Sequence, residues 1–526
     1  MADNLHFFVI KLISLFTKNF ALVLNLYYLL TFPLTAFFSM VVFRYLKISS
    51  IISILCSQIY AFLPYHIMRG EAHLFLSSYY LIPLMLLILI WIQREEPITL
   101  INKKINIEKK LIFSCSLIIA LLFSSAGVYY AFFIAFVLFI ITMYNLFQKN
   151  LNKAFWSFIL LITLCIGLLL NLLPSIIYTL NHGTNKLVVA RSSIEAEVYG
   201  LKIAQFFVPV YDHGISILTK LINNYRLHPL PNEGSEYLGV IGIIGFIVLL
   251  VFILIKESNI NNHYLQLVKY LSTLNIFCIL LSTIGGIGSL FALVISPQIR
   301  AYNRISVIIA FFCFLTIALL LEYLKQNMRN KKFNFNIILN ITLIIVFTFG
   351  IYEYYVPNFT NYTATKKDFQ NDANFISEIE SKMPINSMIF QLPYVPFPEN
   401  PPVNNLGDYE LFKGYLHSNH LKWSYGSMKG RESDQWIKYT ANLPLQDMLE
   451  SLVLSNFNGI YIDRLGYKDN GEQVISQIKT IINTDPQISS NNRLVFFNLI
   501  DYKDRTLKKY SSEELTQKRK SLLNQY

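Results

Sequence analysis

Long apolar runs, and their abrupt end, dominate the pattern of hydrophobic and polar positions along the chain. From about residue 20 to about residue 350 each run is long enough to cross a bilayer, whereas no such run occurs between residues 354 and 526. By this length criterion we predict about ten transmembrane helices. They cover approximately residues 20–43, 49–67, 73–92, 111–125, 127–147, 154–180, 237–255, 269–293, 304–324 and 335–352.

The pattern predicts a membrane all-α polytopic bundle followed by a small extracytoplasmic α/β domain. Three short apolar runs in the second half are typical of buried strands, namely residues 387–393, 459–463 and 494–499. Helical patterns surround them at about residues 367–381, 444–455 and 472–482. The predicted domains are an interfacial outer segment at 1–19, a transmembrane domain at 20–353 with a long outer loop at 182–236, an α/β domain at 354–502 and a charged tail at 503–526.

The basic residues indicate the sidedness of the bundle. Lys and Arg fall in alternate loops, at residues 44–47, 94–110, 149–153, 256 and 325–332. Loops rich in Lys and Arg are cytoplasmic, so the N-terminus, the loop 182–236 and the α/β domain are expected outside. The net charge of +12 is then explained by Lys and Arg in the cytoplasmic loops, and we expect no nucleic-acid partner.

Cysteine usage limits the chemistry further. All five cysteines lie in apolar runs, so the α/β domain cannot form internal disulfides. The first twenty residues hold apolar positions at helical spacing, which predicts an interfacial helix on the outer surface. An outside N-terminus without a signal sequence is unusual, and one further helix before Met1 would place it inside.

Ionisable groups at the mouths of membrane helices are candidate functional residues. The densest set lies between two predicted spans and contains His66, Arg69, Glu71 and His73. One interpretation is a charged turn at the headgroup level with a satisfied Arg–Glu pair. The other is a site in which a carboxylate beside a cation serves as a base or a metal ligand.

Two further outer segments hold candidate residues. Asp3, Asn4 and His6 open the chain, where a frayed end is the alternative to a role. Arg300 and Arg304 stand beside a helix start, where they suit either a lipid-linked phosphate or an ordinary lipid headgroup. In the long loop, which we expect to form an ordered lid or surface helix, the candidates are Glu195, Glu197, Asp212, His213 and Glu233.

Residues 414–431 of the α/β domain combine aromatic, basic and glycine residues. Tyr415, Trp423 and Arg431 give this segment the composition of a carbohydrate-contacting loop, and a surface loop packing on the membrane domain is the alternative. The glycines do not form a phosphate loop, because neither GxxxxGK[ST] nor a strand-tied GxGxxG occurs. In the charged tail we expect one helix capped by Ser511 or Ser512.

The chain resembles the GT-C membrane glycosyltransferases, and within them the bacterial YfhO-like and related uncharacterised enzymes. The segments that carry the resemblance are residues 65–73, 300–304 and 391–431, within an architecture that covers most of the chain. The resemblance implies a polyprenyl-phosphate sugar as donor and an acidic residue in the first outer loop. Here the span that should precede that loop is absent, so either Asp3 stands in for the acid or the acid lies upstream.

Together these observations predict an enzyme of the plasma membrane that moves a sugar from a polyprenyl-phosphate donor to a cell-envelope glycan or lipid. The carboxylate of Asp3 or Glu71 would either deprotonate the acceptor hydroxyl or hold a divalent cation, and the sequence leaves these two roles open. The predicted roles are catalysis for Asp3, Glu71 and His66, donor-phosphate binding for Arg69, Arg300 and Arg304, and acceptor or sugar contact for His73, Tyr415, Trp423 and Arg431. The alternatives are a flippase for lipid-linked sugars, against which the lack of an internal repeat argues, and a non-catalytic envelope assembly protein.

Overall fold

A computed structural model describes residues 3–94, 107–188, 191–210, 216–226, 234–256, 258, 260–327, 333–354 and 361–524. The chain divides into two compact units. The first comprises residues 1–181 and 191–358, and the second comprises residues 182–190 and 359–526.

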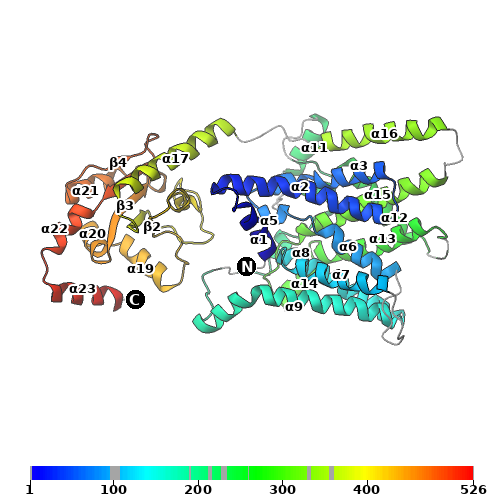
Figure 1. The fold of residues 1–526 in the computed structure, drawn as a ribbon, viewed down its shortest axis with the longest axis horizontal. Helices are drawn as coiled ribbons and strands as arrows, with labels where there is room; N and C mark the ends of the chain where they lie inside the picture. Colours follow the sequence, from blue (N-terminus) through cyan, green and yellow to red (C-terminus); the bar gives the residue numbers. More distant parts are fainter. Residues whose placement is uncertain are drawn as a thin grey trace. The chain divides into compact units, whose positions relative to one another are not determined.

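The regular elements described in the first unit are helices, and its long helices run alongside one another (Figure 1). Its elements are α1 (Asn4–Ile13), α2 (Phe20–Tyr45), α3 (Ser50–Ala61), α4 (Pro64–Arg69), α5 (Leu74–Ser77), α6 (Ile82–Arg94), α7 (Ile107–Ser124), α8 (Val128–Phe147), α9 (Leu151–His182), α10 (Glu195–Val198), η1 (Ile203–Phe206), α11 (Ser216–Arg226), α12 (Gly239–Leu254), α13 (His263–Ser282), α14 (Ile287–Val294), η3 (Tyr302–Ile305), α15 (Ser306–Asn327) and α16 (Phe333–Tyr352).

Six helical segments among the described residues are long and apolar enough to cross a membrane. They are Phe20–Tyr45, Ser50–Arg69, Val128–Phe147, Leu151–His182, His263–Ser282 and Tyr302–Asn327. The unit thus has the helices of a membrane protein. Each of the other four predicted spans also contains a helix, but α6, α12 and the apolar part of α16 are shorter than a full span.

The core of the first unit is built around α15, which packs against α3, α12 and α13. The contact between α12 and α15 is close because α12 carries Gly245 there. A Cβ at Gly245 would lie 2.5 Å from the carbonyl oxygen of Cys313, so no larger residue fits without moving a backbone. Small residues allow apolar helices to approach closely, which is how packing holds such bundles together.

The structure corrects two predicted spans. The run 73–92 is not one helix, because α5 ends at Ser77 and α6 begins only at Ile82. Pro83 stands in the first turn of α6, where a residue without an N–H group is accommodated, and it favours a helix start there over a continuous helix. The run 269–293 is also divided, since α13 ends at Ser282 and α14 follows separately.

The second unit is an α/β fold with one five-stranded sheet in the order β2-β1-β3-β5-β4. β1 runs parallel to both β2 and β3, whereas β5 is antiparallel to β3 and β4. Its elements are α17 (Tyr362–Lys382), β1 (Met388–Leu392), η4 (Glu410–Phe412), α18 (Lys413–His417), β2 (Lys422–Trp423), α19 (Glu432–Ala441), α20 (Leu445–Leu454), β3 (Phe457–Asp463), η5 (Arg464–Gly466), α21 (Glu472–Ile482), β4 (Gln487–Ile488), β5 (Leu494–Asn498), α22 (Ile500–Leu507) and α23 (Ser512–Asn524).

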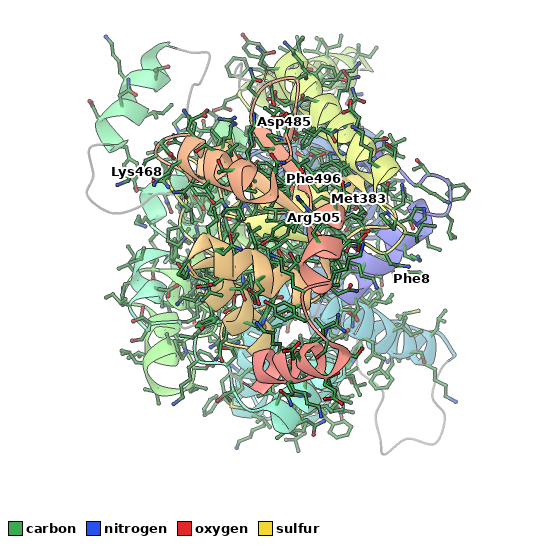
Figure 2. All side chains as sticks on the ribbon, turned by 90° about the vertical axis from the view of Figure 1, so that its left-hand side faces the viewer. Phe8, Met383, Lys468, Asp485, Phe496 and Arg505 are labelled. Atoms are coloured by element: carbon green, nitrogen blue, oxygen red, sulfur yellow. The ribbon has the colours of Figure 1, made fainter. Side chains whose placement is uncertain are left out.

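Each face of the sheet is covered by its own apolar cluster. Side chains of α20 and α21 pack against one face, and α17 packs against the other. Met383 and Phe496, both labelled in Figure 2, belong to the cluster under α17. The alternation of inward side chains along β5, with Val495 and Phe497 on one face and Leu494 and Phe496 on the other, explains why a short continuous apolar run forms a central strand.

The tail forms a capped helix, as predicted. The hydroxyl of Ser511 accepts a hydrogen bond from the backbone N–H of Glu514 at 3.3 Å, and the Glu514 carboxylate accepts from the N–H of Ser511 at 2.8 Å. This reciprocal pair is a capping box at the start of α23. The helix is tied to α20 by Lys518, whose ammonium lies 2.7 Å from the Glu450 carboxylate.

Candidate functional site

The turn at residues 64–73 does not hold its four ionisable side chains together. His66 and Arg69 are buried, with exposed fractions of 0% and 4%, whereas Glu71 and His73 are exposed. The expected pair of Arg69 with Glu71 is therefore not present, because the guanidinium faces a different carboxylate inside the bundle. The predicted role of Glu71 requires a carboxylate that is shielded from water beside Arg69. The exposed position of Glu71 does not provide this.

His66 is held by the helices around it. Its Nε2 lies 2.8 Å from the Thr31 hydroxyl and its Nδ1 lies 2.8 Å from the carbonyl oxygen of Ala61. The ring also stacks on Phe32 with centroids 3.8 Å apart. Both ring nitrogens are used within the bundle, so the geometry assigns His66 a supporting place rather than the predicted catalytic one.

Glu236 is the carboxylate that Arg69 faces. An Arg69 guanidinium nitrogen lies 3.8 Å from Glu236 Oε1, and both side chains are almost completely buried. Asn303 donates a hydrogen bond to the same oxygen at 2.9 Å, and the backbone N–H of Ser235 donates to the other carboxylate oxygen, Oε2, at 2.9 Å. A buried carboxylate is stable only when paired and hydrogen-bonded, and Glu236 meets both conditions.

Sequence reasoning missed Glu236 although a signal was present. The residue ends the long loop directly before an apolar run, which is the same position at a helix mouth that singled out Glu71. Glu233 was chosen in that segment instead, and it lies outside the described residues, as do Asp212 and His213.

Arg69 and Arg304, two of the predicted phosphate-binding arginines, lie around the start of α8. The Arg304 guanidinium lies over the ring of Tyr129 at 4.2 Å, and Arg69 and Arg304 both act electrostatically on the neighbouring Tyr130. The Tyr130 hydroxyl lies 3.2 Å from that of Tyr65, whose ring Arg69 covers at 5.0 Å. Two of the three proposed phosphate-binding arginines thus converge on one tyrosine cluster.

Arg300 has a different partner. It forms an ion pair of 2.5 Å with Glu195 and lies over Tyr199 at 5.2 Å. Burial alone lowers the pKa of Arg300, but the bond to Glu195 outweighs it and the pKa is raised. Glu197 accepts a hydrogen bond from the backbone of Gly285 at 2.8 Å, so α10 of the predicted outer loop is ordered and held at this end of the bundle.

Among the described residues, two of the buried polar atoms that lack a hydrogen-bond partner matter for this cluster. They are the hydroxyl of Tyr302, a residue that is 1% exposed, and Nε of Arg304. Tyr302 lies near Tyr129, the ring that Arg304 covers. Buried donors without a partner are costly, which makes them candidates for contact with a ligand.

Asp3 lies at the same end of the bundle. A Cβ at Gly127, the residue before α8, would be 3.6 Å from Asp3 Oδ1 and 3.9 Å from the Tyr130 ring. Burial raises the pKa of the half-buried Asp3 carboxyl. The same end holds His6, which is fully buried, with Nε2 3.0 Å from the carbonyl oxygen of Ala126 and Nδ1 2.7 Å from the Tyr27 hydroxyl.

The three candidate residues of the second unit have separate surroundings. Tyr415 is 65% exposed, whereas Trp423 is half-buried and donates its indole N–H to Ser418 at 2.7 Å. Arg431 donates to the backbone carbonyls of His182 and Gly183, at 2.8 and 3.2 Å. Trp423 therefore offers a ligand only its ring, and Arg431 is partly engaged within the unit.

No cation site is formed by the usual ligands in the part of the chain that the structure describes. Among those residues, no three or more His, Cys, Asp and Glu side chains gather as a metal site. The carboxylates at the end of the bundle instead meet arginine, amide and hydroxyl groups.

Comparison with known families gives a match over the first part of the chain. The sequence profile described as "Domain of unknown function (DUF6311)" matches residues 5–289, which is more than half of the chain and includes Arg69 and Glu236. No curated protein matches the chain.

Proposed function

We propose that this chain, which belongs to the DUF6311 family, is a membrane glycosyltransferase that uses a polyprenyl-phosphate sugar as donor. The observation that carries the proposal is the convergence of Arg69 and Arg304 on one tyrosine cluster beside the unpartnered hydroxyl of Tyr302. Guanidinium groups and a hydroxyl suit a phosphate oxygen, which carries negative charge and accepts several hydrogen bonds.

The reaction follows from where charge develops. The acceptor hydroxyl loses its proton to a carboxylate and attacks the anomeric carbon, while the bond from that carbon to the lipid phosphate breaks. The phosphate takes the bonding electrons, and Arg69, Arg304 and the N-terminal end of α8 stabilise its growing charge. Attack from the face opposite the leaving group inverts the anomeric configuration.

Asp3 is the better candidate for the base. Its carboxylate is half-buried and burial raises its pKa, so it accepts a proton more readily than an exposed carboxylate does. Glu71 is exposed, and the guanidinium of Arg69 faces Glu236. Glu236 has its oxygens occupied by Asn303, Ser235 and Arg69, so we assign it the positioning of Arg69 rather than proton transfer.

The remaining features of the proposal concern location and partners. We place the chain in the plasma membrane with about ten spans, its second unit and Asp3 on the extracytoplasmic side, because Lys and Arg mark the opposite loops. The acceptor is an envelope glycan or lipid. Any divalent cation would be held jointly by substrate phosphate and a carboxylate, as oxygen-rich sites hold Mg²⁺.

Kinetics of Tyr302→Phe and Arg304→Gln test this proposal. The assay combines the full chain in nanodiscs, a labelled polyprenyl-phosphate sugar and an envelope acceptor extract. Tyr302→Phe removes a hydroxyl that no described residue uses, so we expect folding to be retained and donor KM to rise about tenfold. Arg304→Gln should lower transfer further, and Lys256→Gln serves as a control at an exposed position.

Three results would contradict the proposal. Unchanged kinetics in both Tyr302→Phe and Arg304→Gln would remove the phosphate site. Movement of intact donor across liposomes, with its glycosidic bond never cleaved, would favour the flippase. If the full chain neither transfers sugar nor moves the donor, the assembly-protein reading replaces the enzyme.

A further inference from the structure

The second unit contains a cavity of about 840 Å³ between α19, β2 and the start of β3. Arg519 of α23 also lines the cavity, and Figure 1 labels all four of these elements. Ligand pockets in proteins occupy about 300 to 1,000 Å³, so the cavity is large enough for an extended small ligand. Two of the four tryptophans of the chain, Trp423 and Trp436, line it.

Both indole rings are held rigidly from behind. Trp436 stacks on Phe457 with centroids 5.8 Å apart and planes inclined by 9°. Trp423 meets Tyr461 edge-on at 5.5 Å, and its N–H is bonded to Ser418. Rigid aromatic walls cost little conformational entropy on binding, and their faces suit the C–H surfaces of a ligand.

The cavity contains polar groups that can form hydrogen bonds with a ligand. Glu432 and Ser433 line the cavity as exposed residues, and Trp436 is half-buried there, so their polar atoms can meet a ligand. Arg519 uses one nitrogen, Nε, on the carbonyl of Leu454 at 3.2 Å. The cavity thus offers both donors and acceptors to a ligand.

The opposite charges of Glu432 and Arg519 restrict the ligand class. An anionic ligand would meet the Glu432 carboxylate, and a cationic ligand would meet the Arg519 guanidinium. A ligand with apolar faces, several hydroxyl groups and no net charge fits both. We infer that this cavity binds a neutral oligosaccharide.

A second cavity in the same unit shows why charge alone does not indicate a site. It is lined by Asp372, Lys413 and Arg493, but these residues are bound to one another and to Asp463 and Glu410 at 2.7 to 3.1 Å. These three charges are therefore satisfied within the fold. The cavity lined by Trp423 and Trp436 differs, because its rings are held in place and it has polar groups that can bind a ligand.

The inference rests on the proposed function only in that an envelope glycan is the proposed acceptor, and binding itself needs no donor. The test is saturation-transfer NMR on the full chain in nanodiscs, with chitotetraose, cellotetraose and mannotetraose as separate probes. We expect at least one tetrasaccharide to bind. Trp436→Leu should weaken that binding about tenfold while keeping apolar packing on Phe457, and Glu432→Gln should weaken it several-fold.

Gln435→Ala is the matched control, because Gln435 is an exposed residue of α19 that does not line the cavity. This variant should bind the tetrasaccharide as tightly as the unmodified chain. Thermal unfolding of each variant separates loss of the cavity from loss of the fold. The inference would be overturned if none of the three tetrasaccharides binds. It would also be overturned if Trp436→Leu and Glu432→Gln both bind as tightly as the unmodified chain. Sugar transfer without such binding would overturn it and leave the proposed function standing, and binding without transfer would do the reverse.

Discussion

The contrast between Glu236 and Glu71 shows what single residues of this chain do. Both are acidic residues at the mouth of an apolar helix, and their sequence positions are equivalent by that rule. Only Glu236 is buried, because Asn303 and Arg69 reach it from distant parts of the chain. No local pattern contains such contacts, so the sequence could place Arg69 and Arg304 at one end of the bundle but could not identify their shared carboxylate.

Substitution of Asp3 and Glu71 separates the two candidate bases. Asp3→Asn should abolish sugar transfer, because an amide cannot accept the acceptor's proton. Glu71→Gln should leave the rate within about twofold, since its side chain is exposed. Initial rates in nanodiscs at matched protein levels check this. The opposite pair of results would move the base to Glu71.

His6 should make stability depend on pH. Burial lowers its pKa from 6.5 to about 4, while in the unfolded chain it protonates near 6.5. The folded state then binds fewer protons between these values, so its stability is complete above pH 6.5 and falls as the pH drops toward 4, by roughly 3 kcal/mol.

Thermal unfolding from pH 7 to pH 4 measures the effect of His6. His6→Gln, which cannot titrate, should lose less stability over this range than the unmodified chain. Parallel curves for the two proteins would show that His6 is not buried as described.

At the scale of elements, several strands and helices with a clear apolar pattern in the second unit were predicted, whereas very short strands and a break within an apolar run were not. The strands β1, β3 and β5 and the helices α17, α20 and α21 were all expected, because their apolar periodicity is local. The strands β2 and β4 were missed, since two residues carry no periodicity. The division between α5 and α6 was also missed, because hydropathy continues across it.

The link between β3 and β5 gives a prediction of stability. Asp463 is fully buried and accepts from Arg493 Nε at 3.0 Å and from a terminal nitrogen at 2.7 Å. Asp463→Asn should destabilise the second unit by about 3 kcal/mol, or roughly 6 to 12 °C in Tm, because it leaves a partly buried guanidinium without its main partner.

Asp485→Asn is the control for this pair. Asp485, labelled in Figure 2, faces Lys479 in an ion pair whose side chains are 82% and 55% exposed. Exposed pairs contribute little, so Tm should hardly change. Equal Tm values for the two variants would contradict the ranking.

At the scale of the whole molecule, the apolar pattern ends near residue 350, and the structure divides the chain into two units. The structure places the boundary between Asn358 and Phe359, and it assigns residues 182–190 of the predicted outer loop to the second unit. That assignment depends on contacts such as the one from Asn185 to the Lys429 carbonyl, at 2.8 Å, which sequence spacing cannot reveal.

The membrane topology can be tested by cysteine labelling. Glu513→Cys places a thiol on exposed α23, and Lys256→Cys places one in a loop predicted to be cytoplasmic. With the outer barrier opened, an impermeant reagent should label the first and not the second. Reverse labelling would invert the sidedness and move the proposed reaction to the cytoplasm.

The product of the full chain tests the central claim most directly. The purified protein in nanodiscs is given a polyprenyl-phosphate sugar of known anomeric configuration and an envelope acceptor, and the products are identified by mass spectrometry and NMR. We predict free polyprenyl phosphate and an equal amount of glycosylated acceptor with inverted configuration, both lost in Asp3→Asn. Two results would contradict the proposed mechanism. One is donor that stays intact after prolonged incubation with the unmodified protein, and the other is a glycosylated acceptor with retained anomeric configuration.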